Sequence, residues 1–268
     1  MANPDHLNQL RTGKWGEWRA ANPTVAPDLI DAELAGHDLH GLNLSKAHMR
    51  GADLSGANLK GADLSRAIVE GARLSNASLT EVKLDSVQLD FLDLSNLDLS
   101  HASLHRATLR GANLTRTNLR HADLSQATME SAIFDDADLS GATLQGASLR
   151  GGRFDSTIMR GVEGAGAILD GVEFQNLNME GAVFSDARVF ANGFMLEGPV
   201  CLCLSYAGGK DAHKNEREAN GTGCRSAGTA QRLAKLGATR GTGGGSYHHR
   251  SRRRTQNTRA PRAWRYPA

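Results

Sequence analysis

A large apolar residue recurs every five residues from Leu29 to Phe194, and this period constrains the fold more than any other feature of the chain. Of the 34 positions in the series, only Gly164 lacks a large apolar side chain. A small residue, most often Ala, stands two positions earlier in most units, as in the Gly-Ala-Asp-Leu-Ser of residues 51–55. The chain is therefore built from one short unit repeated many times.

This period excludes an α-helix, because five residues at about 100° each turn the apolar residue by roughly 140° per unit and leave no apolar face. In an extended segment, by contrast, the small residue and the apolar residue two positions later point to the same side. A chain that obeys this rule throughout must wind into closed coils. We expect the small and apolar residues inside, the polar residues outside, and hydrogen bonds between successive coils.

The unit resembles the A-(D/N)-L-x-x repeat of the pentapeptide-repeat family over residues 29–194. The resemblance implies an all-β fold, a right-handed quadrilateral parallel β-helix with four units per coil. At about 4.8 Å per coil, some 8.5 coils would form a rod about 40 Å long. We expect residues 1–28 to form an N-terminal capping helix and leader, residues 29–194 the β-solenoid, and residues 195–268 a basic, Gly-rich tail that is largely disordered.

Four units per coil place residues 20 apart on top of one another, which gives two further expectations. One internal ladder of aromatic rings should form from Phe134, Phe154, Phe174 and Phe194. One coil should be wider than its neighbours, because its small positions hold Val82, Val87, Leu92 and Leu97. We expect the extra volume of that coil to be structural and not a ligand pocket.

Gly164 interrupts the apolar series. The missing side chain predicts a local void or a bulge, at a cost of about 2–5 kcal/mol if nothing repairs it. The alternative is a hinge or a protruding corner that contacts a partner.

The open ends of a solenoid need caps. Residues 5–20 place Leu7, Leu10, Trp15 and Trp18 near helical spacing, before Asn-Pro at residues 22–23. We expect the two tryptophans to cover the first coil, although such a pair is also typical of a binding hot spot. Similar Trp-Arg-x-x-Asn-Pro leaders precede the repeats in some bacterial members of the family that the chain resembles.

The net charge of +2 conceals two regions of opposite sign. Residues 29–194 hold 22 acidic and 14 basic residues, whereas residues 195–268 hold 4 acidic and 14 basic residues. Nucleic acid or another anionic surface could contact the tail through Arg250, Arg252, Arg253 and Arg254. The alternatives are a solvated tail with only non-specific affinity and a tail translated in an altered reading frame.

The sequence predicts no catalytic, cofactor-binding or metal-binding residues, and therefore a protein that is not an enzyme. No nucleophile with a base, pair of carboxylates in a cleft, or glycine loop fits its context. Cys201, Cys203 and Cys224 with His213 are a weak pattern for zinc. Without an apolar signal segment or a run long enough to cross a bilayer, we expect a soluble bacterial protein of the cytoplasm that does not bind membranes.

The expected function is a non-enzymatic scaffold for protein–protein interaction. The family resemblance also implies a DNA-mimicking modulator of DNA gyrase or another topoisomerase. Against this, the net charge of −8 on residues 29–194 is about a third of the ~24 charges on ~40 Å of duplex. Two further alternatives are nucleic-acid binding through the tail and a remnant of a fusion to a Toll/interleukin-receptor-type domain, faintly resembled by residues 202–211. The sequence specifies neither the partner nor the oligomeric state.

Overall fold

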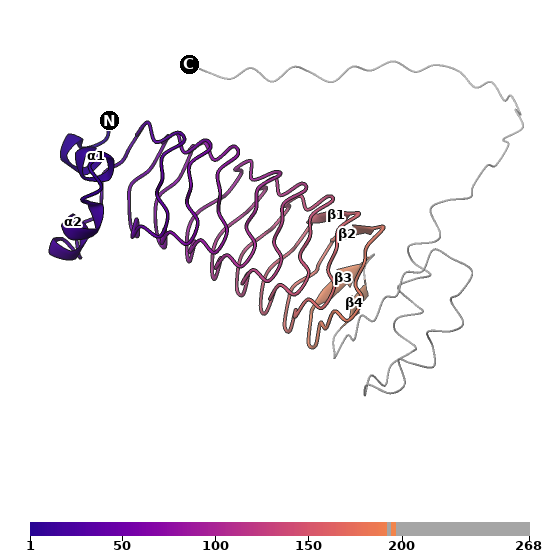
Figure 1. Cartoon of the computed structure of the whole chain (residues 1–268). Coiled ribbons are helices and arrows are strands. Elements are labelled where there is room, and N and C mark those ends of the chain that lie inside the picture. Colours follow the sequence, from indigo (N-terminus) through magenta and orange to yellow (C-terminus); the bar gives the residue numbers. More distant parts are fainter. Residues whose placement is uncertain (192–193, 197–268) are drawn as a thin grey trace, which may run out of the picture. The chain divides into compact units, whose positions relative to one another are not determined.

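The computed structural model describes residues 1–191 and 194–196. Two helices begin the chain and a stack of coils follows them (Figure 1). The named elements are α1 (Pro4–Arg11), α2 (Trp15–Ala21), β1 (Arg153–Asp155), β2 (Glu173–Gln175), β3 (Val189–Ala191) and β4 (Phe194–Leu196). Most of the repeat region forms single-residue parallel bridges in place of longer strands, because each unit turns a corner after two or three extended residues.

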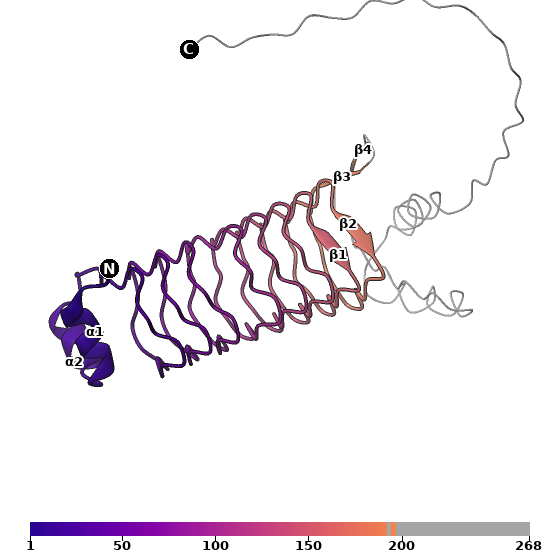
Figure 2. The ribbon, with the colours of Figure 1, turned by 90° about the horizontal axis from the view of Figure 1, so that it is seen from above.

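Parallel bridges join residues that are 20 apart, from Asp28↔His48 to Ile168↔Arg188. β1 and β2 pair at the same spacing, with Arg153 opposite Glu173. Each coil therefore contains four five-residue units, as the family resemblance implies. Seen from above, the coils follow one another in a single stack (Figure 2).

Three kinds of backbone hydrogen bond hold a unit in place. The central residue donates to the next coil, as from Leu54 N to Arg73 O at 2.8 Å. The residue before it donates to the preceding coil, as from Asp53 N to Ala32 O at 2.9 Å. A turn bond within the coil links Ala57 N to Leu54 O at 3.0 Å. Most backbone polar groups of interior coils are thus paired with other backbone groups.

The small and central positions form the core. Ala52 and Leu54 are fully buried, and the same is true at almost every equivalent position up to Ala147 and Leu149. Each buried Leu contributes about 1.5–3 kcal/mol relative to an exposed one. A core of narrow aliphatic layers therefore explains why so few aromatic residues suffice.

The predicted aromatic ladder is confirmed for its first three members. The rings of Phe134 and Phe154 stack with their centroids 4.6 Å apart and an angle of 6° between their planes. The rings of Phe154 and Phe174 lie 5.7 Å apart and are tilted by 47°. The side chain of Phe194 lies outside the described residues.

The void or bulge predicted at Gly164 is wrong, because another side chain fills the space. A Cβ atom added to Gly164 would lie only 2.3 Å from Cδ1 of Phe184, which is 20 residues further on and fully buried. The bond from Gly164 N to Val183 O measures 2.7 Å, so the ladder continues without a bulge. The ring of one coil thus occupies the volume that the coil before it leaves free.

The widened coil opens a seam, defined here as the junction between residues 69–79 and residues 88–98. The backbone N–H groups of Val69, Leu74 and Leu79 make no hydrogen bond of normal length and angle to the following coil, in contrast to Leu54 and Leu59 in the coil before. Parallel bridges persist between residues 68 and 88 and between residues 78 and 98, so the coils stay in register. The seam lies where Val87, Leu92 and Leu97 follow alanines, and the larger side chains hold the two coils apart.

Residues 5–20 form two helices, and not the single capping helix expected. α1 begins at an N-cap, Asn3, whose side chain accepts from Asp5 N at 2.9 Å. It ends at Arg11 with Thr12 as its C-cap, and Gly13 follows with a φ of +69°, a left-handed conformation that favours glycine and stops the helix. α2 then begins at Trp15 and turns its buried side toward the first coil.

Candidate interaction surface and terminal cleft

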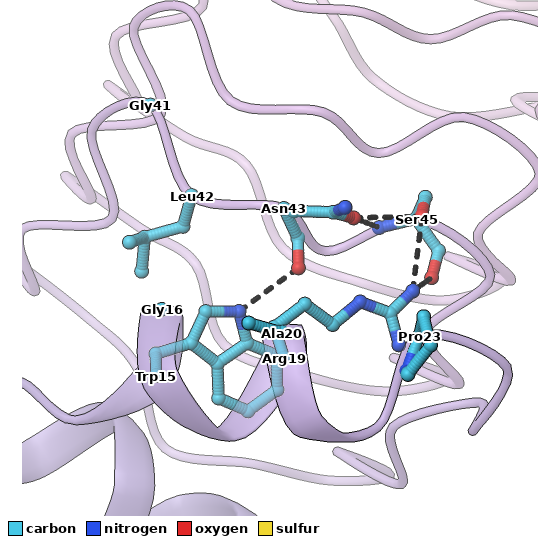
Figure 3. Close-up of a pocket in the computed structure, with 9 residues that line it drawn as sticks. All are labelled: Trp15, Gly16, Arg19, Ala20, Pro23, Gly41, Leu42, Asn43 and Ser45. Carbon is cyan, nitrogen blue, oxygen red and sulfur yellow. Dashed lines mark hydrogen bonds between the residues drawn. The ribbon is translucent and has the colours of Figure 1, made fainter.

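α2 closes the open edge of the first coil with side-chain donors. The indole Nε1 of Trp15 donates to Asn43 O at 2.9 Å, and Nη2 of Arg19 donates to Ser45 O at 2.8 Å (Figure 3). In the regular coils, main-chain N–H groups of the preceding coil bind the equivalent carbonyls. Of the two tryptophans expected to cover the first coil, Trp15 caps it, whereas Trp18 contacts the helices. The ring of Trp18 packs on those of His6 and Trp15, at 4.7 and 5.0 Å.

The Asp and Asn residues that directly precede a central residue form the turns of the coil. Oδ1 of Asp53 accepts the main-chain N–H of Ser55 at 3.0 Å, and Asp63 binds Ser65 in the same way at 2.9 Å. This local bond is a common way for Asp and Asn to fix a turn. The repeated aspartates are therefore structural groups and not a set of catalytic acids.

One outward column carries charges of both signs, spaced by 20 residues. Its members are Arg50, Glu70, Asp90, Arg110, Glu130, Arg150 and Asp170. Arg50 contacts Glu70 at 2.8 Å, Arg110 contacts both of its acidic neighbours at 3.5 and 3.7 Å, and Arg150 does the same at 3.8 and 3.4 Å. Along this column the charges compensate one another, so it does not resemble the uniform charge of a nucleic-acid backbone.

Two exposed ion pairs lower the pKa of their carboxyl groups. Arg73 binds Asp53 at 2.6 Å, and this hydrogen bond is the main reason why the pKa of Asp53 lies far below its ordinary value. The hydrogen bond from Arg153 lowers the pKa of Asp135 in the same way. Both pairs lie on the face of the rod formed by the units of Leu54, Leu74 and the others spaced by 20 residues. Of the four faces, this one carries the largest net negative charge.

Phe91 is the most exposed large apolar side chain of the repeats, with 80% of its surface accessible. It occupies a corner of the coil with a φ of 60°, and among the described residues no other Phe, Tyr or Trp has a positive φ. Its ring covers Gly111 of the next coil, where an added Cβ would lie 2.7 Å from Phe91 Cδ1. Phe91 thus lies on the surface of the rod beside the seam, with one face of its ring over Gly111 and most of its surface open to solvent.

The described residues hold no group of three or more His, Cys, Asp or Glu side chains arranged for a metal ion. Within the same residues, neither helix has the length and apolar character needed to cross a membrane. The predicted nucleic-acid contacts Arg250, Arg252, Arg253 and Arg254 lie outside the described residues, as do the three cysteines. These predictions remain untested.

A family model for pentapeptide repeats matches the chain with eight copies. The matches run through residues 28–61, 57–90, 93–130, 112–151, 122–161 and 153–186, more than half of the chain. The chain belongs to the pentapeptide-repeat family. Proteins of this family fold as right-handed β-helices, in agreement with the coils described above, and they are generally non-enzymatic structural or interaction proteins.

Several solved structures of pentapeptide-repeat proteins are similar to this one. Rfr23 of the cyanobacterium Cyanothece 51142 is 30% identical, with 37% of this chain and 64% of that chain aligned and a TM-score of 0.26. This match spans less than two thirds of Rfr23. HetL of Nostoc sp. strain PCC 7120, involved in the regulation of heterocyst differentiation, is 27% identical, with 62% and 90% aligned and a TM-score of 0.27.

QnrB1, a plasmid-mediated fluoroquinolone resistance protein, is 19% identical in its trypsin-treated form, with 56% of this chain and 88% of that chain aligned and a TM-score of 0.32. No curated protein matches the chain by sequence. With TM-scores this low, these superpositions carry no function over to this pentapeptide-repeat protein.

Proposed function

We propose that this protein is a non-enzymatic scaffold of the bacterial cytoplasm, and that Phe91 anchors a protein partner on the repeat rod. The observation that supports the proposal is the position of Phe91, an exposed aromatic ring on a left-handed corner. A left-handed conformation costs a non-glycine residue about 1–2 kcal/mol. Exposure of the ring adds no compensating burial, so the residue is unfavourable for the isolated rod.

The left-handed corner belongs to the fold, because 17 other non-glycine residues of the repeats share it. What distinguishes Phe91 is an exposed aromatic ring at such a corner, and aromatic residues dominate the energetics of protein interfaces. Gly71 and Gly111 occupy the equivalent corners of the two adjacent coils; the ring of Phe91 lies over Gly111, and no side chain at Gly71 covers its other side. A partner with an apolar pocket could therefore enclose the ring without steric hindrance from the rod.

Site-specific crosslinking tests this proposal. A photoreactive phenylalanine analogue at position 91 should form a discrete adduct with the partner, and excess wild-type protein should compete for it. Phe91→Gly should fail to compete although its fold is intact. Ser131→Gly, a change at another left-handed corner of the same column, serves as the matched control and should compete fully. Equal competition by Phe91→Gly would show that the ring is not the anchor.

DNA mimicry directed at gyrase is the alternative function. The negative sign of the net charge on residues 29–194 fits this alternative, whereas its low density and the mixed column from Arg50 to Asp170 weaken it. A supercoiling assay with full-length protein and with residues 1–198 separates the two. Inhibition or drug protection retained by the shorter chain would favour mimicry by the rod, and no effect from either would exclude it. Loss of a salt-sensitive DNA shift on removal of residues 195–268 would instead indicate binding through the tail.

A further inference from the structure

A cleft lies between α2 and the first coil, about 450 Å³ in volume (Figure 3). Trp15 and Arg19 line it from the helix, and Leu42, Asn43 and Ser45 line it from the coil. The cleft thus combines an apolar wall with polar groups of the rod's exposed edge.

Arg19 is a charged residue without a counter-ion. Its side chain is buried, with 6% of the residue exposed, and it bridges the cleft from α2 to the coil. Its guanidinium donates to Val25 O, Ser45 O and Ser45 Oγ, all of which are neutral acceptors. In the described part of the chain, no Asp or Glu oxygen lies within 4.0 Å of it, and its buried Nε has no acceptor.

The contrast with the arginines of the repeats is informative. Arg73, Arg110 and Arg153 are about half exposed to water, and each contacts at least one carboxylate. Water would screen these charges even without a partner, but it reaches Arg19 poorly. A buried charge is unfavourable unless an opposite charge compensates it. The most buried arginine of the described residues is therefore the one that most needs an anion.

Asn43 adds free donors to the same cleft. It lies at the edge of the first coil, where no earlier coil can accept its main-chain N–H. Within the described residues, neither this N–H nor the side-chain Nδ2 has an acceptor. Its Oδ1 accepts from the main-chain N–H and the hydroxyl of Ser45, at 3.1 and 2.7 Å. A guanidinium and an unpaired amide thus line one cleft.

We infer that this cleft binds a carboxylate, which supplies the counter-ion of Arg19. A carboxylate in the cleft would place an opposite charge beside the guanidinium, and its single negative charge balances the single positive charge of Arg19. Trp15, Leu42 and Pro23 offer an apolar surface for the remainder of the ligand. The carboxylate comes either from a small free acid or from the C-terminus of a peptide.

The indole N–H of Trp15 reports on the site, because it binds Asn43 O beside Arg19. Full-length protein is titrated with sodium propionate at constant ionic strength, with sodium chloride as the reference, and the three tryptophan indole signals are followed by NMR. We expect a saturable shift of the Trp15 signal with propionate only. An equal response to chloride, or no saturable shift, would overturn the inference.

Two substitutions separate binding from capping. Arg19→Gln should abolish the propionate response, whereas Arg11→Gln, the same change of charge on the exposed part of α1, should preserve it. Because Arg19→Gln also removes capping bonds, Asn43→Asp is the decisive variant. Asp forms the same turn at positions 53 and 63, so this change preserves the fold and places a carboxylate beside Arg19. It should eliminate the propionate response, and an unchanged response would contradict the inference.

The source of the carboxylate is resolved with a short apolar peptide in two forms. If the peptide with a free C-terminus binds more tightly than both the amidated peptide and propionate, the ligand is a peptide terminus. Binding of propionate without the peptide would identify a free acid. At ten times the dissociation constant, the ligand should shift the folding equilibrium of the cap about 11-fold, an effect that Asn43→Asp should remove.

Discussion

The coil at Gly164 and the coil that contains Leu92 and Leu97 both depart from the repeat, with opposite results. The first lacks a large central side chain, yet its backbone bonds to the next coil are intact because Phe184 fills the space. The second keeps every central residue but has large side chains in its small positions, and it loses bonds to the preceding coil. Loss of a central side chain leaves the backbone hydrogen bonds between coils intact, whereas larger side chains at the small positions disrupt them.

The comparison shows that interior volume is balanced along columns of residues 20 apart and not within each unit. A deficit can be filled from a neighbouring coil, because side chains can extend along the axis of the rod. An excess cannot be transferred, because both neighbouring coils are already packed to the density of a protein interior.

The largest effect is expected at the repaired site. Phe184→Ala should lower the free energy of unfolding by about 3–5 kcal/mol, because Gly164 offers no side chain to fill the resulting cavity. Gly164→Leu restores the repeat but should still destabilise by about 1–3 kcal/mol through a clash with Phe184. The double variant Gly164→Leu/Phe184→Leu should regain most of the loss, as measured by urea unfolding. Additive losses in the double variant would contradict volume exchange along the column.

A smaller cost is expected at the seam. Leu92→Ala with Leu97→Ala removes the excess volume and allows the coils to approach, so new backbone bonds should offset part of the lost burial. Leu94→Ala, at a central position that is 1% exposed, should cost about 2–5 kcal/mol. In the same unfolding experiment, the double substitution should lower the free energy of unfolding by less than Leu94→Ala does. A larger cost would show that the leucines stabilise the seam by packing alone.

Phe91→Gly should stabilise the rod by about 0.5–1 kcal/mol. It removes the strain of the left-handed corner, and the greater freedom of glycine in the unfolded chain offsets part of the gain. Phe91→Ala keeps the strained backbone without the ring, and we expect its stability to stay close to that of the wild type. Thermal unfolding of the three proteins checks this order. Destabilisation by glycine would mean that the ring contributes to the fold.

The smallest effect concerns pH. Because the hydrogen bond from Arg73 lowers the pKa of Asp53 in the folded state, this pair stabilises the rod above the ordinary carboxyl pKa of about 3.9, and the stabilisation is lost as the pH falls further. Asp53→Asn should therefore flatten the fall in melting temperature below that pH. Asp63→Asn makes the same change in a turn without an arginine partner, and its melting curve should keep the wild-type slope. Identical slopes for both variants would exclude a contribution from the pair.

The sequence predicts the winding of the chain, because a period of five between apolar residues permits few other folds. It also predicts the contact between Phe134 and Phe154, because four units per coil place residues 20 apart together. The repair of Gly164 by Phe184 follows from the same spacing, but reading the sequence unit by unit predicted a void instead. The compensated charges of Arg110, Asp90 and Glu130 are equally visible at that spacing once columns are compared.

The ends and the seam are less predictable. The sequence indicated Trp15 as a cap, but it did not indicate that Arg19 would reach Ser45, since that contact depends on how α2 turns after Gly13. It indicated a wide coil, but not whether the hydrogen bonds to the preceding coil or those to the following coil would be lost. The bonds that follow Leu92 and Leu97 are intact and only those before them are lost, a result of packing in three dimensions.

Amide hydrogen exchange, measured residue by residue, tests most directly whether interior volume sets how tightly the coils bond. Exchange should be fast at Val69, Leu74 and Leu79, whose N–H groups face the seam. It should be slow one coil later, at Leu89, Leu94 and Leu99, which occupy the same column positions and donate to the next coil at 2.7–2.8 Å. Equal protection in both coils would contradict the claim.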